Sequence, residues 1–444
     1  MYFFSFLIGS VYYSDTKFQI TFNRAVVMSE YYSSIFTRTS TVFVVFLLSS
    51  IIISPSVMAQ SDWQEDGWLT TSLAQERLDN GDEFGCYGMQ GLSWKADPGA
   101  VATECRQYIE QRVSANRWGE SPISTFTPDS LSQYQHQIIS ENGFMVHGDN
   151  TNLQGTAWHS SNDTPIDMLD WYNLGRRGGS LEQIIGSKQQ VEDAVDEGGL
   201  VNLYWIGRVN DATIRHDKDI EQYISEQADA WLTTWGQTWS YWSASKCYQL
   251  DHSINQVGQN YVLSFESLIT EQCTSINPGR WNVPLTWAFD VNDSQILSII
   301  DSNGEMENIS EMRHTKEGYS HYENQYLHIS VVNGNRVNIT LTSNDYDIIE
   351  MTEFWNNHSA AITIAAHETT DLFKWSKRFV DQENLVFTWL VIPRPAESKS
   401  PWIPYVAFTV GAGVIITMLL VLKNEGIGPL ARSENHLDTI SEAE

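Results

Sequence analysis

Hydrophobic residues run without a charge through the segment Trp402 to Leu422, which reads WIPYVAFTVGAGVIITMLLVL. At about 1.5 Å of rise per residue, a helix of this length spans roughly 30 Å, the thickness of a bilayer's hydrocarbon core. A buried core helix is the alternative, but such helices are seldom apolar all round, and little chain follows to cover this one. The pattern predicts a single transmembrane helix at 402–422, after a tether at 395–401 and before a short cytoplasmic tail at 423–444.

A second apolar run, from Thr41 to Ser54, follows Arg38 and precedes small residues that end at Ala59. A charged start, an apolar run and small side chains before a cleavage point are typical of a secretory signal. We therefore interpret residues 1–59 as an N-terminal extension and signal peptide, with an uncleaved anchor as the alternative. Both interpretations place the chain beyond residue 60 outside the cell membrane and the C-terminus in the cytoplasm.

Helical and extended patterns alternate in residues 60–276. Asp97 before Pro98 predicts a helix cap, Thr127 and Pro128 predict the start of a second helix, and Ser187 begins a third. The run 200–209 has the composition of a buried strand. These signals predict a mixed α/β head domain.

From Asp217 onward, apolar residues recur every three or four positions and predict one long amphipathic helix. Its stripe includes four tryptophans: Trp231, Trp235, Trp239 and Trp242. Such a row of aromatic side chains either stacks against sugars at the surface or packs into the hydrophobic core. Its continuity with Ile220 and Ile224 favours the core.

Short strand-like runs dominate residues 277–394. They are 284–291, 295–300, 326–332, 336–342, 347–351, 361–366 and 385–392, and Asn333 with Gly334 forms a hairpin signal between two of them. Several short strands in close succession are typical of a sandwich. We expect an antiparallel β-sandwich-like domain next to the membrane. The predicted fold class is therefore an α+β ectodomain, with a mixed α/β head, this second domain and one transmembrane helix.

The composition is 42% hydrophobic and 12% aromatic, as expected for a folded protein, and the formal net charge is −29. A field of that sign repels nucleic acid and anionic lipid. We therefore expect no nucleic-acid partner and no direct binding of the ectodomain to acidic lipid.

The cysteines, which are Cys86, Cys105, Cys247 and Cys273, all lie between the two apolar runs. An even number on the oxidising side of a membrane predicts two disulfides. Loop-closure entropy favours pairing of the sequence neighbours, Cys86 with Cys105 and Cys247 with Cys273, although three pairings are formally possible.

No specific catalytic or cofactor motif occurs in the sequence, and it predicts neither a cofactor nor a defined metal site. The run 79–83 (DNGDE) is interpreted as a solvated turn, with a calcium loop as the alternative. The loop that begins at His147 contains a possible polar site, which consists of His147, Asp149, His159 and Asp163. Such residues bind a divalent metal or exchange protons, but they are also ordinary loop residues.

Five sequons for N-glycosylation are present, at Asn162, Asn292, Asn308, Asn338 and Asn357. Together these patterns predict a membrane-anchored cell-surface protein with a disulfide-stabilised ectodomain that binds an extracellular macromolecule or sugar. The alternative function is a membrane-anchored extracellular hydrolase, possibly metal-assisted, with its site in the head. The sequence indicates neither the ligand nor the oligomeric state.

Overall fold

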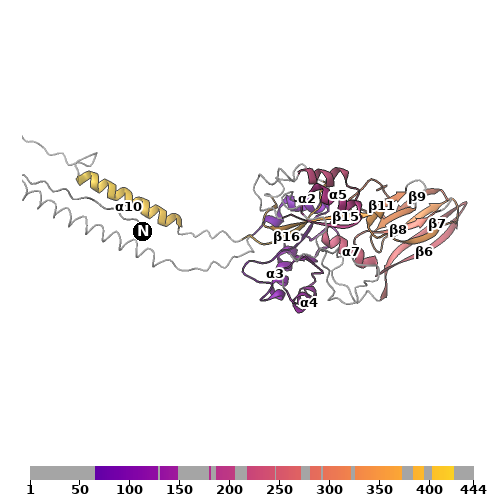
Figure 1. Ribbon diagram of the computed structural model, residues 1–444, viewed down its shortest axis with the longest axis horizontal. Coiled ribbons are helices and arrows are strands. Elements are labelled where there is room, and N and C mark those ends of the chain that lie inside the picture. The colour runs from indigo at the N-terminus through magenta and orange to yellow at the C-terminus, as the bar shows by residue number, and fades with distance from the viewer. Residues whose placement is uncertain are drawn as a thin grey trace, which may run out of the picture. The chain divides into compact units, whose positions relative to one another are not determined.

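The structure is a computed structural model of the 444-residue chain. It describes residues 66–128, 131–148, 180–181, 187–205, 218–245, 247–271, 281–291, 294–321, 326–372, 384–394 and 403–424. The predicted signal at 1–59 and the tether at 395–401 lie outside these residues. The described residues belong to one compact unit, Ser61–Glu444, and they contain a parallel sheet and two antiparallel sheets (Figure 1).

The parallel sheet is a half-barrel in which every described strand pairing is parallel. Its strands, in spatial order, are β3 (Val146–Gly148), β2 (Ser124–Phe126), β1 (Glu83–Cys86), β16 (Thr388–Val391), β15 (Ala360–Thr369) and β4 (Gly199–Trp205). A further strand, β5 (Trp231–Thr233), pairs with the first half of β15. Because all strands run the same way, their carboxyl ends meet at one edge of the sheet.

Side chains alternate between the two faces of this sheet. In β4, Val201, Leu203 and Trp205 share one hydrophobic cluster with the helices α2 (Ser72–Asn80), α3 (Pro98–Glu110) and α5 (Lys188–Asp196). Leu200 and Tyr204 belong to a second cluster with α7 (Trp235–Ser245). We call the side of the sheet that packs against α7 the α7 face. Both faces of the sheet are therefore buried, as is usual for parallel sheets.

Several predicted helix starts are confirmed by their hydrogen bonds. The Asp97 side chain accepts from the Ala100 N–H at the start of α3, and Ser187 accepts from the Gln190 N–H at the start of α5. The second helix, α4 (Gln133–Glu141), begins later than predicted, because a capping box built from Ser132 and Gln135 sets its first turn.

The long helix predicted from Asp217 is wrong. The chain forms a short π-helix, η3 (Tyr223–Gln227), then β5 and then α7. The Arg313 guanidinium donates to the carbonyls of Ile224, Ser225 and Ala228, and so satisfies the end of η3. The core interpretation of the tryptophan row is confirmed, since Trp231, Trp235, Trp239 and Trp242 are all buried.

Two antiparallel sheets occupy the sequence between Tyr248 and Met351. One has the order β10 (Gly304–Glu305), β9 (Ile296–Asp301), β13 (Arg336–Leu341), β7 (Asn260–Ile269), β6 (Tyr248–Val257). The other has the order β11 (Gly318–His321), β12 (Leu327–Val331), β8 (Leu285–Asp290), β14 (Asp347–Met351). Apolar side chains from both sheets form one hydrophobic cluster, which we call the antiparallel core. A short 3-10 helix, η4 (Trp355–Asn357), packs against β8 and β12.

The partners predicted for the last two strands are wrong. The runs 361–366 and 385–392 do contain strands, but these are β15 and β16, and they pair in parallel with each other and with β4 and β1. A buried parallel strand and a buried sandwich strand give the same short apolar run, so local sequence does not distinguish their partners.

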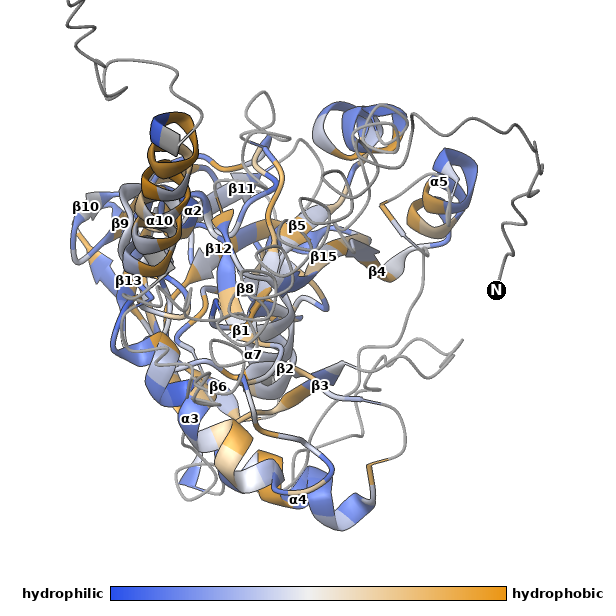
Figure 2. Cartoon of the chain, turned by 90° about the vertical axis from the view of Figure 1, so that its left-hand side faces the viewer, coloured by the Kyte–Doolittle hydropathy of each residue, from blue (hydrophilic) through white to orange (hydrophobic). Residues whose placement is uncertain are grey.

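The C-terminal helix α10 (Ile403–Asn424) is 22 residues long. Its apolar side chains include Phe408, which is 77% exposed, and Figure 2 shows hydrophobic colour along most of the helix. By contrast, α5 carries an apolar stripe and a polar face (Figure 2). Among the residues that the structure describes, no helix combines the length and the hydropathy that crossing a membrane requires.

Candidate functional site

The strand β15 contains a bulge at the carboxyl edge of the parallel sheet. Ala366 lies opposite Trp389 and Thr369 lies opposite Val391, so three steps along β15 match two along β16. The bulge holds His367 and Glu368, and Glu368 has a φ of 45°. This left-handed backbone is uncommon for a residue with a side chain, and such strain clusters at functional sites. Bulges likewise occur often beside active sites, where they redirect a side chain.

Aromatic rings from three other strands surround His367. Its ring centroid lies 4.3 Å from that of Phe126 at the end of β2, and 4.8 Å from that of Tyr204 in β4. The Tyr87 ring, directly after β1, lies 6.1 Å away. Only 6% of His367 is exposed, so the imidazole is buried beside these rings.

Tyr87 connects these rings to the second bulge residue. Its ring stacks on Phe126 with 5.4 Å between the centroids and 3° between the planes. Its hydroxyl donates to the Glu368 carboxylate over 2.8 Å. We call the five residues Tyr87, Phe126, Tyr204, His367 and Glu368 the edge cluster.

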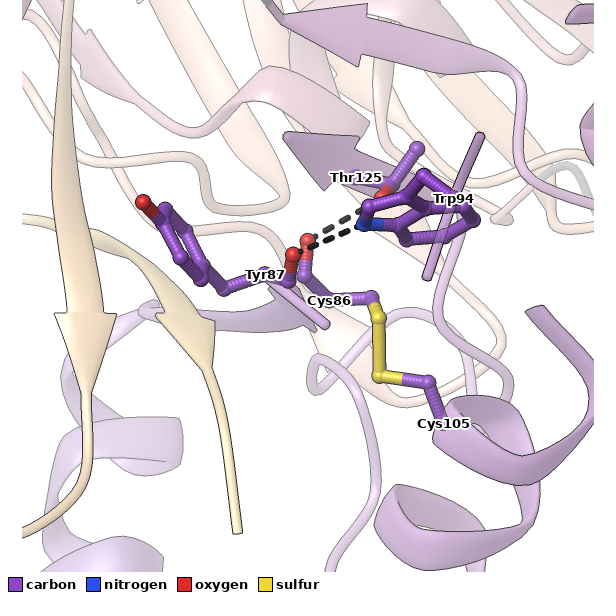
Figure 3. The surroundings of a disulfide bond; sticks show 5 residues. All are labelled: Cys86, Tyr87, Trp94, Cys105 and Thr125. Carbon is purple, nitrogen blue, oxygen red and sulfur yellow. Dashed lines mark hydrogen bonds between the residues drawn. A yellow bond between two sulfur atoms is a disulfide. The ribbon is translucent and has the colours of Figure 1, made fainter. Parts of the chain in front are cut away.

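A disulfide next to Tyr87 fixes the end of β1 (Figure 3). Cys86 is bonded to Cys105 of α3, as the sequence predicted. Thr125 donates to the Cys86 carbonyl over 3.1 Å, and the Trp94 indole donates to the Tyr87 carbonyl over 3.0 Å (Figure 3). These three bonds hold the backbone on both sides of the point from which the Tyr87 side chain leaves the sheet.

The edge cluster offers an imidazole, a carboxylate, two phenols and an aromatic ring. Imidazole and carboxylate transfer protons near neutral pH, and phenols donate hydrogen bonds. In open sheets with parallel strands, ligands bind outside the carboxyl ends of the strands, which is where this cluster lies. Within the described ranges, no group of three or more His, Cys, Asp or Glu side chains is placed to hold a metal ion.

A buried carboxylate lies deeper on the α7 face, at the amino end of β1. Glu83 accepts from the Gly236 N–H over 2.8 Å and from the Thr388 hydroxyl over 3.3 Å. Burial raises the pKa of its carboxyl to about 6, against the smaller opposing effects of these donors and of Ser124. Because Gly236 lies in the first turn of α7, Glu83 places an acid where the helix dipole favours one, and it joins α7 to the sheet.

Of the polar site predicted in the loop after β3, the structure describes only His147. Its Nδ1 lies 2.9 Å from Nδ1 of His136 in α4, and its Nε2 lies 2.9 Å from the Phe144 carbonyl. Burial, together with the neighbouring His136, lowers the pKa of His147 to about 3. This contact links α4 to β3. Asp149, His159 and Asp163 lie outside the described residues, so the predicted site stays a prediction.

The run 79–83, interpreted as a solvated turn, is largely buried. Gly81 ends α2 with a φ of 107°, and the Asp82 carboxylate accepts from the Arg77 guanidinium and, over 2.6 Å, from the Trp389 indole. Asp82 and Glu83 are both fully buried. The interpretation as a solvated turn is wrong, because a helix end followed by a buried strand places these acids inside the fold.

The structure describes one cysteine of the second predicted disulfide and three of the five predicted glycosylation sites. Cys247 is disulfide-bonded, and its predicted partner Cys273 lies outside the described residues. Asn308 and Asn357 are exposed, whereas the half-buried Asn338 accepts from the Ser264 hydroxyl over 2.6 Å. The sequons at Asn162 and Asn292 fall outside the described ranges.

Sequence analysis did not single out His367 and Glu368, although it predicted a strand at 361–366, directly before them. The signal was present: a polar pair follows an alanine-rich, fully buried strand. The sequence gives no sign that Tyr87, Phe126 and Tyr204 lie at the same edge of one sheet.

No family model, curated protein or solved structure matches this chain.

Proposed function

We propose that this protein is an exported, membrane-anchored binding protein that recognises a carbohydrate at the carboxyl edge of its parallel sheet. The observation that carries this proposal is the bulge in β15, which brings His367 and Glu368 to a group of aromatic rings from three other strands. A bulge and a left-handed glutamate both reduce stability, so their presence at the ligand-binding edge of a parallel sheet supports a role in binding.

The chemistry of the edge cluster favours a sugar that is neutral or positively charged. Aromatic faces carry partial negative charge and attract C–H groups and cations, and a carboxylate accepts hydrogen bonds from hydroxyl or ammonium groups. The net charge of −29 opposes the approach of an acidic ligand. A neutral sugar or an amino sugar fits these three conditions.

Hydrolysis is the second candidate function, and the adjacency of His367 and Glu368 favours it. A histidine and a carboxylate at one site supply a general acid and a general base. Binding and hydrolysis place the ligand at the same cluster, so one set of variants tests both.

Anchoring is part of the proposal and is supported by the uncharged run from Trp402 to Leu422 and the signal-like run ending at Ala59. The two antiparallel sheets, which share one core, would form the sandwich nearest the membrane. The disulfide between Cys86 and Cys105 suits an oxidising, extracellular location.

The test measures thermal unfolding of the full-length protein in detergent with neutral, amino and acidic sugars. A ligand that binds only the native state raises the melting temperature. We expect an increase with neutral or amino sugars, its loss in Glu368→Gln, and its retention in the matched control Glu353→Gln, since Glu353 is exposed and lies outside the cluster. Equal increases in both variants, or a response to acidic sugars alone, would contradict the proposal.

The same proteins distinguish hydrolysis from binding. If the protein is a hydrolase, wild type releases shortened products from an oligosaccharide that raises its melting temperature. His367→Asn then stops product release while the increase in melting temperature remains. Absence of products from every oligosaccharide that binds would leave binding as the function.

A further inference from the structure

The strand β6 is an unprotected edge of the larger antiparallel sheet. It pairs with β7 through ten consecutive residue pairs without a shift in register. Within the described part of the chain, no strand pairs with its other side. In an antiparallel ladder, alternate residues direct their N–H and C=O groups away from the existing partner, so β6 presents a row of such groups at the edge.

The other edges of the two antiparallel sheets are short or interrupted. The strand β10 has two residues, β11 has four, and the pairing of β14 with β8 shifts between Ile348 and Met351. Proteins usually protect exposed edges in these ways, or with lysine or proline. The β6 sequence, YQLDHSINQV, contains no lysine, arginine or proline, and its only acid is Asp251. Its length, its uninterrupted pairing and its low charge make β6 suited to accepting another strand.

The apolar side chains of β6 have neighbours in β7 and in the antiparallel core but no neighbouring strand beyond the edge in the described part of the chain. Leu250 and Ile254 are half-buried and pack against the antiparallel core, whereas His252 between them is exposed. A strand added to β6 would place its own side chains beside those of Leu250 and Ile254 on the same face of the sheet.

We propose that β6 pairs antiparallel with β6 of a second copy of this chain, centred on His252. In this register Leu250 lies opposite Ile254 of the second copy, and Asp251 lies opposite Ser253. Apolar residues therefore meet apolar residues twice, and the two acids do not face each other. A register shifted by two residues in one direction would place Asp251 opposite itself, where like charges are destabilising. The proposal depends on the antiparallel sheets alone and is independent of the ligand of the edge cluster.

A second copy fits this strand better than an unrelated extended peptide. Pairing about a two-fold axis requires a strand that is complementary to itself, and the register centred on His252 satisfies this condition at Leu250, Asp251 and Ile254. Strand addition by a peptide requires no such symmetry. The two occupants therefore predict different crosslinks.

Cysteine crosslinking of the full-length protein in detergent tests the register. In an antiparallel pair, opposite Cα atoms lie about 4.5 to 5.5 Å apart, within the range of a disulfide. We expect His252→Cys to form a covalent dimer on mild oxidation. The matched control Gln256→Cys lies on the same face, but its copies would be about 27 Å apart at 3.4 Å per residue, so no dimer is expected. Absence of a dimer for His252→Cys, or equal yields for both variants, would overturn the proposal.

Sedimentation of lysine variants provides a second measurement that does not depend on oxidation. His252→Lys places two positive charges opposite each other, whereas Gln256→Lys places each lysine opposite Tyr248. We expect His252→Lys to weaken the dimer about threefold to tenfold and Gln256→Lys to leave it unchanged. Both side chains are exposed, so both variants should fold. A monomeric wild-type protein, including one that binds extended peptides, would also refute the pairing.

Discussion

The two interiors of this molecule differ in polarity. The α7 face of the parallel sheet buries polar side chains among its apolar ones, namely Glu83, Asn202, Thr363, His367 and Thr388. The antiparallel core is formed mainly by hydrophobic side chains, among them Leu263, Phe265, Phe289, Ile329, Val337 and Ile339. The α7 face buries a carboxylate and an imidazole, which are groups that titrate. The polar groups at the antiparallel core, such as the Trp287 indole and the Ser267 hydroxyl, are hydrogen-bond donors but do not titrate near neutral pH.

This difference changes what burial costs in the two regions. Burying a polar group costs free energy unless hydrogen bonds replace those to water. On the α7 face they are replaced: Asn202 accepts from the Trp235 indole and the Thr363 hydroxyl, each over 2.8 Å. An apolar core would provide about as much stability as this hydrogen-bonded network. The network can, however, fix the geometry of the neighbouring edge cluster. We infer that the antiparallel core contributes stability and that the α7 face supports the site.

The largest effect on stability is expected in the antiparallel core. Phe289 is fully buried, and its ring centroid lies 4.9 Å from that of Phe265. Phe289→Ala removes this contact and leaves a cavity, so it should lower the free energy of unfolding by about 3 to 5 kcal/mol. Urea unfolding followed by tryptophan fluorescence measures the loss.

Leu297→Ala is the control for this prediction, because Leu297 is 50% exposed and should change stability by less than about 1 kcal/mol. At temperatures where Phe289→Ala is still folded, the response of the edge cluster to ligand should be that of wild type. A lost response in this variant would show that the two regions are not separate in function.

A smaller effect, and one that depends on pH, is expected on the α7 face. The pKa of Glu83 is raised to about 6 in the fold from 4.5. Between these values the folded state binds more protons than the unfolded state, so stability falls as the pH rises from 4.5 to 6. Over the whole titration, from about pH 3.5 to about pH 7, the fall amounts to about 2 kcal/mol at 1.36 kcal/mol per pKa unit.

Glu83→Gln should remove this contribution. Its free energy of unfolding, measured against urea at about pH 3.5 and about pH 7, should fall less than that of wild type by about 2 kcal/mol. The fall in Phe289→Ala should match wild type, since no titrating group changes. If Glu83→Gln retained the wild-type pH dependence, another group would be responsible.

Local signals in the sequence predicted the elements better than their partners. The caps at Asp97 and Ser187 were predicted because capping involves residues three positions apart. The runs that became β15 and β16 were predicted as strands but assigned to the wrong sheet. Their partners β4 and β1 lie more than 150 residues earlier in the chain, and strand pairing at that distance leaves no local mark.

The prediction of a long helix from Asp217 was wrong for a similar reason. The spacing of its apolar residues suits a helix, but Trp231 to Thr233 pair with β15 and Arg313 satisfies the carbonyls at the end of η3. These partners lie 85 or more residues away in sequence. The edge cluster was missed because it exists only once β1, β2, β4 and β15 lie in one sheet, and because the bulge at His367 depends on the register with β16.

The smallest expected effect concerns the strained residue of the edge cluster. Glu368→Ala and Glu368→Gly both remove the hydrogen bond from Tyr87, but only glycine adopts the φ of 45° without a steric cost. Glycine usually destabilises a strand relative to alanine. Here we expect Glu368→Gly to be more stable than Glu368→Ala by about 1 kcal/mol, because a left-handed backbone costs a residue with a Cβ roughly 1 to 2 kcal/mol. Urea unfolding of the two variants measures this difference, and a more stable alanine variant would mean that the bulge relaxes. Neither variant should bind ligand, because both lack the Glu368 carboxylate. If Glu368→Gly is the more stable variant and does not bind, the strained backbone at residue 368 serves the site rather than the stability of the fold.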